Sequence, residues 1–372
     1  MAVHYHYGAF PPHSQVNWAE LIRPLEVASS AISRYDGLLA SIPNVDLLLS
    51  PLTTQEAVLS SKIEGTQATM GEVLQFEAER GAPRQFSEKK DDISEILNYR
   101  KAIRFAMNEL KSLPLCQRIV KGSHKILMDS VRGANKAPGQ YRVNQNWIGP
   151  EGCAIEEAAF IPISADKLPE GMSNWEKYIH ADAPSRLVQL ALLHAEFEAL
   201  HPFLDGNGRL GRMLIPLFLW SVNIIQTPTF YISAYFEAHK EQYYAHLRNL
   251  SEKGDWTAWC RFFLDAIATQ AERNSQKANA ILALYADLKK RLSETLRSQY
   301  AMSVLDFIFD RPIFSGSHFT HNRDIPLATA RRLLCTLREY GVIAEMTPAR
   351  GRQPAIYCFA QVLNIAEGHD AF

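Results

Sequence analysis

Two apolar segments separated by a short polar run constrain the fold of this chain most. Apolar residues recur at three- and four-residue steps from Leu187 to Leu200, which predicts an amphipathic helix. Pro202 disfavours helical geometry in the residue before it, so this helix should end near His201. A second apolar segment follows from Leu210 to Trp220, and Pro216 inside it predicts a kink or a less regular helix. The sequence therefore predicts a helix–loop–helix corner.

The run that joins the two helices carries residues suited to a nucleotide phosphate. It reads His201-Pro202-Phe203-Leu204-Asp205-Gly206-Asn207-Gly208-Arg209-Leu210-Gly211-Arg212. A helix start attracts anions, and glycines let the backbone approach a phosphate closely. Arg209 and Arg212 share one helix face, and guanidinium groups bind phosphate bidentately. Asp205 offers the oxygen that magnesium prefers, and a neutral His201 can accept a proton. Each residue alone is more typical of a cap, a turn or a solvated face, but their contiguity favours transfer from a nucleotide to a hydroxyl.

The same run resembles the signature of the Fic family, His-Pro-Phe-x-Asp/Glu-Gly-Asn-Gly-Arg-x-x-Arg, and matches every fixed position. Fic proteins are typically helical enzymes that move AMP from ATP to Ser, Thr or Tyr hydroxyls of proteins and release pyrophosphate. The resemblance implies that His201 is the catalytic base and that Asp205 holds Mg²⁺ or Mn²⁺. It also implies that ATP is bound by Gly206, Asn207, Gly208, Arg209, Leu210, Gly211 and Arg212. The related Doc kinases carry Lys at the position of Gly208, so the glycine favours AMP transfer.

An upstream segment resembles the inhibitory motif of Fic proteins, Ser/Thr-x-x-x-Glu-Gly/Asn. Ser60, Glu64 and Gly65 match it, within a helical stretch predicted at about 53–69. The pattern alone is that of a surface helix with an ordinary Glu. The resemblance implies that Glu64 forms a salt bridge with Arg212, and an arginine paired to a carboxylate cannot also clamp a phosphate. We therefore expect the chain to inhibit itself.

Two further segments resemble parts of the Fic active site. Residues 141–149 and 159–162 indicate a β-hairpin, which in the family lies over the site as a flap and registers the target by strand addition. The flap residues expected near ATP are Glu157, Ala158, Ala159 and Phe160; the alternative is a hairpin that only packs. Tyr243 and Tyr244 stand where paired tyrosines lie near adenine, although a helical tyrosine is more often a core residue. The family often has an Asn shortly afterwards, which is absent from residues 251–255.

Composition and charge give limited information on the class of partner and on the location of the protein. The net charge of −1 argues neither for nor against a polyanionic partner, and no apolar run is long enough to cross a membrane. The five cysteines have no metal-ligand spacing and there is no signal peptide, so we expect reduced thiols and a cytoplasmic location. The interpretation has four parts: an N-terminal region (1–110), a Fic core (111–270), a helix that connects or forms a homodimer surface (271–296), and a C-terminal domain (297–372).

The C-terminal domain resembles a winged helix-turn-helix. Short helices are predicted around Val304–Ile308 and Ser315–Asn322, a stronger one over Leu327–Tyr340, and strands over Val342–Met346 and Ala355–Phe359. The fold class is thus mainly α. Residues 297–352 hold eight arginines against five acidic residues, a weak footprint for DNA binding. The partner of this domain is left open between DNA and protein.

Our primary hypothesis is a self-inhibited enzyme that transfers AMP from ATP to hydroxyls of target proteins, and to itself as well. Two alternatives remain within enzymes: removal of AMP, or transfer of another phosphate-linked group. A third, of a different class, is a transcription regulator whose Fic core senses nucleotide.

Overall fold

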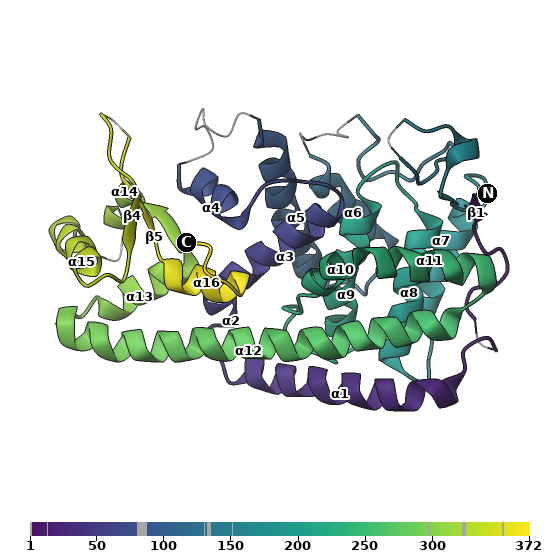
Figure 1. The fold of residues 1–372 in the computed structure, drawn as a ribbon, viewed down its shortest axis with the longest axis horizontal. Coiled ribbons are helices and arrows are strands. Elements are labelled where there is room, and N and C mark those ends of the chain that lie inside the picture. The colour runs from purple at the N-terminus through teal and green to yellow at the C-terminus, as the bar shows by residue number, and fades with distance from the viewer. Residues whose placement is uncertain are drawn as a thin grey trace. The chain divides into compact units, whose positions relative to one another are not determined.

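The computed structural model describes residues 2–12, 14–79, 88–129, 131, 135–150, 152–296, 298–321, 325–351 and 353–372. The chain is mainly α-helical, as predicted (Figure 1). It folds into two compact units, which are described separately. The first comprises Met1–Gly37, Leu59–Gly65 and Leu97–Glu272, and the second comprises Leu38–Val58, Thr66–Ile96 and Arg273–Phe372.

The first unit contains most of the helices. Its elements are β1 (Val3–His4), α1 (Trp18–Ala40, to residue 37), the end of α3 (Ser50–Ile63), most of α5 (Lys90–Glu109), α6 (Gln117–Leu127), β2 (Phe160–Ile161), α7 (Leu168–Ile179), α8 (Arg186–Leu200), α9 (Asn207–Ser221), α10 (Ser233–Ala238), α11 (Lys240–Lys253) and the first part of α12 (Trp256–Leu296). The helical pattern predicted from residue 271 is the second part of α12, one continuous helix (Figure 1).

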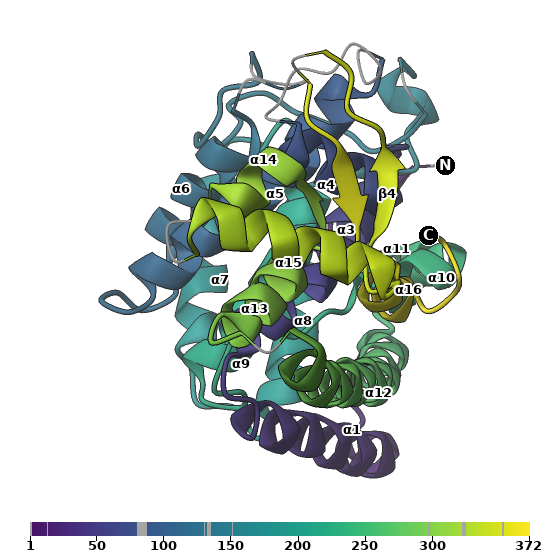
Figure 2. The same ribbon diagram turned by 90° about the vertical axis from the view of Figure 1, so that its left-hand side faces the viewer.

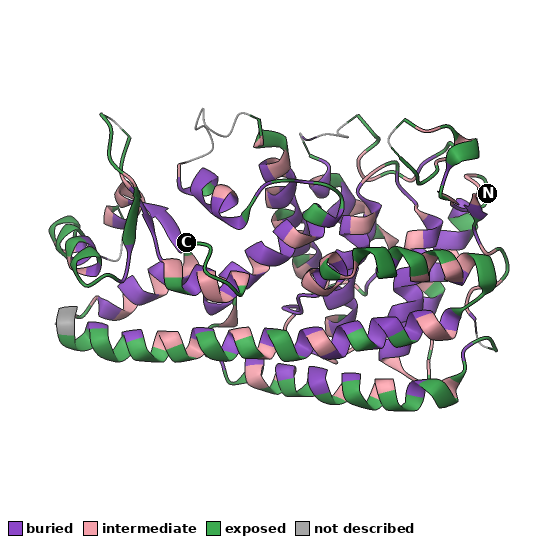
Figure 3. Cartoon of the chain, in the orientation of Figure 1, coloured by how far each residue is buried: buried purple, intermediate pink, exposed green. Residues whose placement is uncertain are grey.

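Helices α8 and α9 form the centre of the first unit. They pack against one another and are buried along most of their length (Figure 3). Their bounds confirm the predicted helix–loop–helix corner, and α8 ends at Leu200, just before the His201–Pro202 pair. Helix α9 runs on through Pro216, so the proline does not end it. The corner is therefore held by the most buried helices of this unit.

The predicted flap hairpin is wrong in part. Residues 148 and 160 form one isolated antiparallel bridge rather than a ladder. The next pairs of such a ladder would place Pro150 and Pro162 in it, and proline has no N–H to donate. The other edge of Phe160–Ile161 is instead occupied by β1, which pairs with it in parallel. Strand β2 therefore lies between two segments of its own chain.

The second unit contains a small antiparallel sheet with helices. Its elements are α2 (Val45–Leu48), most of α3, α4 (Met70–Ala78), the start of α5, the second part of α12, α13 (Ala301–Asp310), β3 (Ile313–Ser315), α14 (Gly316–Thr320), α15 (Leu327–Glu339), β4 (Ala344–Thr347), β5 (Ile356–Cys358) and α16 (Ala360–Glu367). The sheet order is β3-β5-β4. The three helices and the β4–β5 hairpin lie where the sequence predicts them (Figure 2), while β3 and α16 were not predicted.

Two general expectations can be compared with the structure. All five cysteines are free thiols, as expected. Among the described residues, no helix combines the length and apolar character that crossing a bilayer requires.

Candidate active site

The loop between α8 and α9 begins with a strained residue. His201 caps the end of α8 with φ of 45° and ψ of 61°, in the left-handed region that non-glycine residues seldom adopt. Arg142 stabilises this end, because its Nε donates to the carbonyl of His201 (3.0 Å) and its Nη2 to that of Leu200 (3.3 Å). The loop thus presents the His201 imidazole at a fixed point.

Buried polar contacts hold the rest of the loop. Asn207 accepts from the Phe203 N–H and donates to the Phe203 carbonyl, both at 2.9 Å. The His124 ring stacks on Phe203 (3.7 Å between centroids), and its Nε2 donates to the carbonyl of Asp205 (2.9 Å). The Asn207 side chain therefore braces the loop, and only its backbone is left for the phosphate role expected of it.

His201 is buried and neutral. Burial lowers its pKa to about 4, and the positive charge of Arg142 lowers it further, against opposing effects of Glu64 and Asp205. Its Nδ1 is buried and has no hydrogen-bond partner within the described part of the chain. A neutral imidazole can accept a proton from a hydroxyl.

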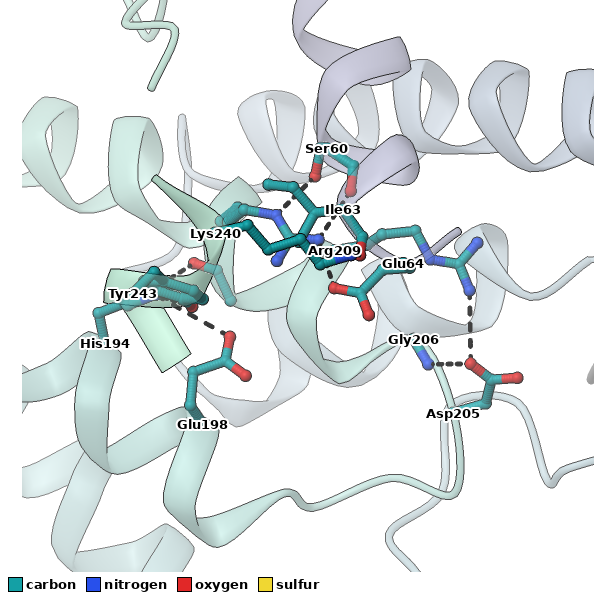
Figure 4. Close-up of polar contacts among 12 residues, drawn as sticks. Ser60, Ile63, Glu64, His194, Glu198, Asp205, Gly206, Arg209, Lys240 and Tyr243 are labelled. Atoms are coloured by element: carbon teal, nitrogen blue, oxygen red, sulfur yellow. Dashed lines mark hydrogen bonds and ion pairs between the residues drawn. The ribbon is translucent and has the colours of Figure 1, made fainter. Parts of the chain in front are cut away.

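Asp205 offers one oxygen for a cation. Its Oδ1 accepts from the Gly206 N–H (2.6 Å) and lies 3.5 Å from Arg209 Nη2 (Figure 4). The carboxylate is 40% exposed, and no contact of Oδ2 is recorded among the described residues. Those residues include no cluster of three or more His, Cys, Asp or Glu side chains able to hold a metal. A metal at Asp205 would therefore take its other ligands from phosphate and water, as Mg²⁺ does.

Arg212 is bound by the inhibitory segment, residues Ser60–Gly65. Its Nε donates to Ser60 Oγ (3.0 Å), and its Nη2 donates to the Ser60 carbonyl (2.8 Å) and to Glu64 Oε1 (2.6 Å). The arginine side chain is 1% exposed. Although burial alone would raise the pKa of Glu64, Arg212 lowers it below its usual value. The pair is therefore ionised at neutral pH.

Glu64 also covers the start of α9. A Cβ built on Gly208 would collide with Glu64 Oε1, so a side chain at 208 and this carboxylate cannot coexist. Gly65 has φ of 103°, which suits glycine and lets the chain turn directly after Glu64. The Glu64 carboxylate thus occupies the space beside the backbone where a phosphate is expected.

The remaining predicted residues divide between surface and core. Leu210 is fully buried. Tyr243 is 1% exposed and packs among the rings of His194, Phe236 and Trp259, whereas Tyr244 as a residue is 43% exposed. Of the two tyrosines, Tyr244 has the ring surface that adenine stacking requires. Glu157 ends a single turn of 3₁₀-helix over Ile155–Glu157, Ala158 is buried, and Phe160 lies in β2.

Sequence reasoning did not identify two ionisable residues at this site. Arg142 stabilises the end of α8, and Glu198, one turn before His201, lies close to Arg212 and Tyr243. Glu198 could have been noticed as a charge within an almost wholly apolar helical segment. The position of Arg142 depends on a long-range contact that gives no local signal.

Comparisons with known proteins agree with this geometry. Residues 22–108 match the model described as "Fic/DOC family N-terminal", and residues 114–219 match "Fic/DOC family". The protein adenylyltransferase Fic of Drosophila melanogaster is 27% identical over 130 residues, which are 34% of this chain and 23% of that protein. The chain thus matches about a quarter of the length of that relative.

Solved structures share the fold. A Fic family protein from Desulfovibrio desulfuricans aligns with a TM-score of 0.55 at 20% identity, over 91% of this chain and 95% of the other. A Fic domain-containing signaling protein from Bacteroides thetaiotaomicron aligns at 0.54 and 16% identity, over 68% and 96%. The two matched models together span just over half of the sequence, and the chain belongs to the Fic/DOC family.

Proposed function

We propose that this chain is a self-inhibited protein adenylyltransferase. It transfers AMP from ATP to a hydroxyl of a target protein, itself included, and releases pyrophosphate. The observation that carries the proposal is that every recorded hydrogen bond of the Arg212 guanidinium goes to the inhibitory segment at the mouth of the anion site. An arginine buried at a helix start, with a carboxylate in the place of a phosphate, is suited to binding a nucleotide once that carboxylate leaves.

His201 would act as the general base. Its neutral imidazole takes the proton of the target hydroxyl as the oxygen attacks the α-phosphorus and the bond to pyrophosphate breaks. A pKa of about 4 makes a weak base, but the negative triphosphate beside the ring raises that pKa toward the working pH. Replacing a general base costs about 10²- to 10⁴-fold in rate.

The α9 end of the site would hold the nucleotide. The N–H groups of Asn207 and Gly208 would face the phosphates, because that of Gly206 already donates to Asp205 Oδ1, and Arg209 and Arg212 would bind the β- and γ-phosphates. A divalent cation, Mg²⁺ or Mn²⁺, fits the single free carboxylate oxygen of Asp205 and would neutralise phosphate charge there. Tyr244, with its exposed ring, is the candidate for adenine stacking.

The experiment that tests this function separates AMP transfer from phosphate transfer. The Glu64→Gly chain is incubated with magnesium and either α-labelled or γ-labelled ATP. We expect protein label from α-labelled ATP only, with one pyrophosphate released for each AMP transferred, and with γ-labelled ATP the label should leave in that pyrophosphate. Both products should be lost in the His201→Ala double variant. Label from γ-labelled ATP would indicate a kinase, and release of AMP from a pre-labelled target without transfer would indicate the reverse reaction.

A second function, DNA binding, is favoured by one observation in the second unit. Helix α15 buries Ala330, Leu333, Leu334 and Leu337 and exposes Arg331 and Arg332 on its other side. An exposed basic helix before a β-hairpin is the arrangement that winged-helix proteins place in a DNA groove. Fluorescence anisotropy of the full chain with duplex DNA tests this: binding should weaken with salt and with Arg331→Ala/Arg332→Ala, and its absence at low salt would contradict the idea.

A further inference from the structure

Glu198 is a buried acid that the proposed mechanism does not use. It lies in α8, one turn before His201, and its Oε1 sits directly against the α-carbon of Gly211. That oxygen is buried without a hydrogen-bond partner among the described residues. Figure 4 shows Glu198 and Glu64 as two separate carboxylates of the site, and both act electrostatically on Arg212.

The hydrogen bonds around Glu198 have a consistent direction only if Glu198 carries a proton. His194 Nδ1 lies 3.3 Å from the carbonyl of Gly211, which can only accept, so the proton of the neutral ring is on Nδ1. His194 Nε2 then accepts from the Tyr243 hydroxyl at 2.9 Å. The single proton of Tyr243 is thereby used, and its contact with Glu198 requires a proton from the acid.

The charges that face Glu198 agree with this assignment. Burial raises the pKa of Glu198 to about 7; the positive charge of Arg212 from α9 opposes the rise, and the negative charge of Glu64 adds to it. Burial also lowers the pKa of His194, its neighbour on α8, to about 3, so that ring is not a counter-ion. The remaining facing group is the phenol of Tyr244. Arg212 is the cation that can stabilise an ionised Glu198.

Withdrawal of the inhibitory segment would leave Arg212 without its present partners. The guanidinium would lose its contacts to the Ser60 hydroxyl, the Ser60 carbonyl and Glu64 together. A buried charge that loses its partner is strongly destabilised, and a flexible arginine would turn away before a phosphate arrived. The other carboxylate that acts on the Arg212 charge is that of Glu198.

We propose that Glu198 is the positioning residue for Arg212: it gives its proton to solvent and pairs with the guanidinium when the inhibitory segment leaves. In this way it holds the arginine in place for the γ-phosphate. Inhibition and activation are then an exchange of Arg212 between two carboxylates. The proposal rests on the proposed nucleotide site, but not on catalysis at it.

Nucleotide affinity tests the proposal independently of turnover. The full chain carrying Glu64→Gly is compared with Glu64→Gly/Glu198→Gln by isothermal titration with magnesium and either α,β-methylene ATP, which cannot transfer AMP, or AMP. Glutamine mimics the protonated acid, so the fold is kept, but it offers no charge to Arg212. Glu64→Gly/Glu196→Gln is the matched control, since Glu196 is a buried carboxylate on the same helix bonded to Tyr5 and His6.

We expect Glu198→Gln to weaken binding of the triphosphate analogue about tenfold, which corresponds to the loss of one charge-assisted hydrogen bond. AMP has no γ-phosphate and should bind with unchanged affinity. The Glu196→Gln control should change the affinity for neither the analogue nor AMP. Unchanged or tighter binding of the analogue overturns the proposal, because Glu198 would then only repel phosphate. Equal losses for both ligands also overturn it, as a general structural effect. No binding of either ligand to Glu64→Gly contradicts the nucleotide site itself, which is a separate failure.

Discussion

Arg212 is the residue at which nucleotide binding and inhibition compete. Burial alone would lower the pKa of Arg212, but the negative charge of Glu64 raises it above the usual value, so the guanidinium stays charged. The guanidinium is buried but the Glu64 side chain is 34% exposed, so losing this charge-assisted contact costs about 1.5–3 kcal/mol. The inhibited state is therefore favoured until another group compensates the charge of Arg212.

The pH dependence of the wild-type chain reports on Glu198. The acid holds its proton in the inhibited state, where its pKa is about 7, and loses it on release. Raising the pH through 7 therefore destabilises the inhibited state relative to the released one. We expect AMP transfer to rise about fivefold between pH 6 and pH 8.

Other groups do not explain such a rise. In the inhibited chain without nucleotide, His201 has a pKa of about 4 and is already neutral at pH 6, and Glu64, whose pKa is lowered, is already ionised. The Glu64→Gly variant, which has no inhibition to release, should show only the titration of His201 and the substrate in the nucleotide complex, and Glu198→Gln should lose the additional rise. An identical profile in all three chains would exclude Glu198 as the titrating group.

At the residue scale the sequence predicted the site because the residues of the motif are adjacent in the chain. His201, Asp205 and Arg212 lie where the motif indicates, and Glu64 contacts Arg212 as the resemblance implied. Tyr243 and Asn207 could not be assigned from sequence, because their roles depend on which neighbours fill the space around them. Tyr243 is enclosed by aromatic rings, and Asn207 is bonded to a backbone four residues away.

At the scale of elements, α10 and α11 hold the inhibitory segment in place. Lys240 Nζ donates to the carbonyl of Ile63 at 2.5 Å, which caps the last turn of α3. Lys62 forms an ion pair with Glu237 at 2.9 Å. Since Tyr243 and Tyr244 belong to the same helix as Lys240, the element that borders the nucleotide site also anchors the inhibitor.

Lys240→Ala should release the segment partly. Losing a charge-assisted hydrogen bond to a carbonyl costs about 1 kcal/mol, so basal AMP transfer should rise about fivefold, less than in Glu64→Gly. Lys253→Ala, at the exposed end of the same helix, is the control and should leave the rate unchanged. The measurement is initial rate of label incorporation; a decrease or no change in Lys240→Ala would show that this contact does not support inhibition.

The small sheet of the first unit illustrates what sequence patterns miss. The hairpin prediction relied on alternation within residues 141–162, but the parallel partner of β2 comes from residues 3 and 4. Tyr5 and His6 fix that segment through the buried Glu196. A pairing across more than 150 residues leaves no local pattern, whereas α8 and α9 were predictable because their periodicity is local.

At the scale of the whole molecule, the inhibitory segment belongs to one continuous helix. Residues 50–58 of α3 fall in the second unit and its last turn in the first. The four-part division of the chain stays a prediction, as do the homodimer and the partner of the C-terminal region. The helical class was predictable from composition and periodicity, but the division into units depends on tertiary contacts.

The central claim is that Glu64 suppresses AMP transfer by His201, and one labelling experiment tests it most directly. Wild type, Glu64→Gly, Glu64→Gly/His201→Ala and the control Gln67→Gly are incubated with α-labelled ATP and magnesium under identical conditions. We predict a rise in protein-bound AMP of about 10- to 100-fold in Glu64→Gly, from a loss of ~1.5–3 kcal/mol of charge-assisted bonding. The control should match wild type, and the double variant should carry no label. Equal label in wild type and Glu64→Gly would contradict self-inhibition, and absence of label from all four chains and from added cell lysate would contradict AMP transfer itself.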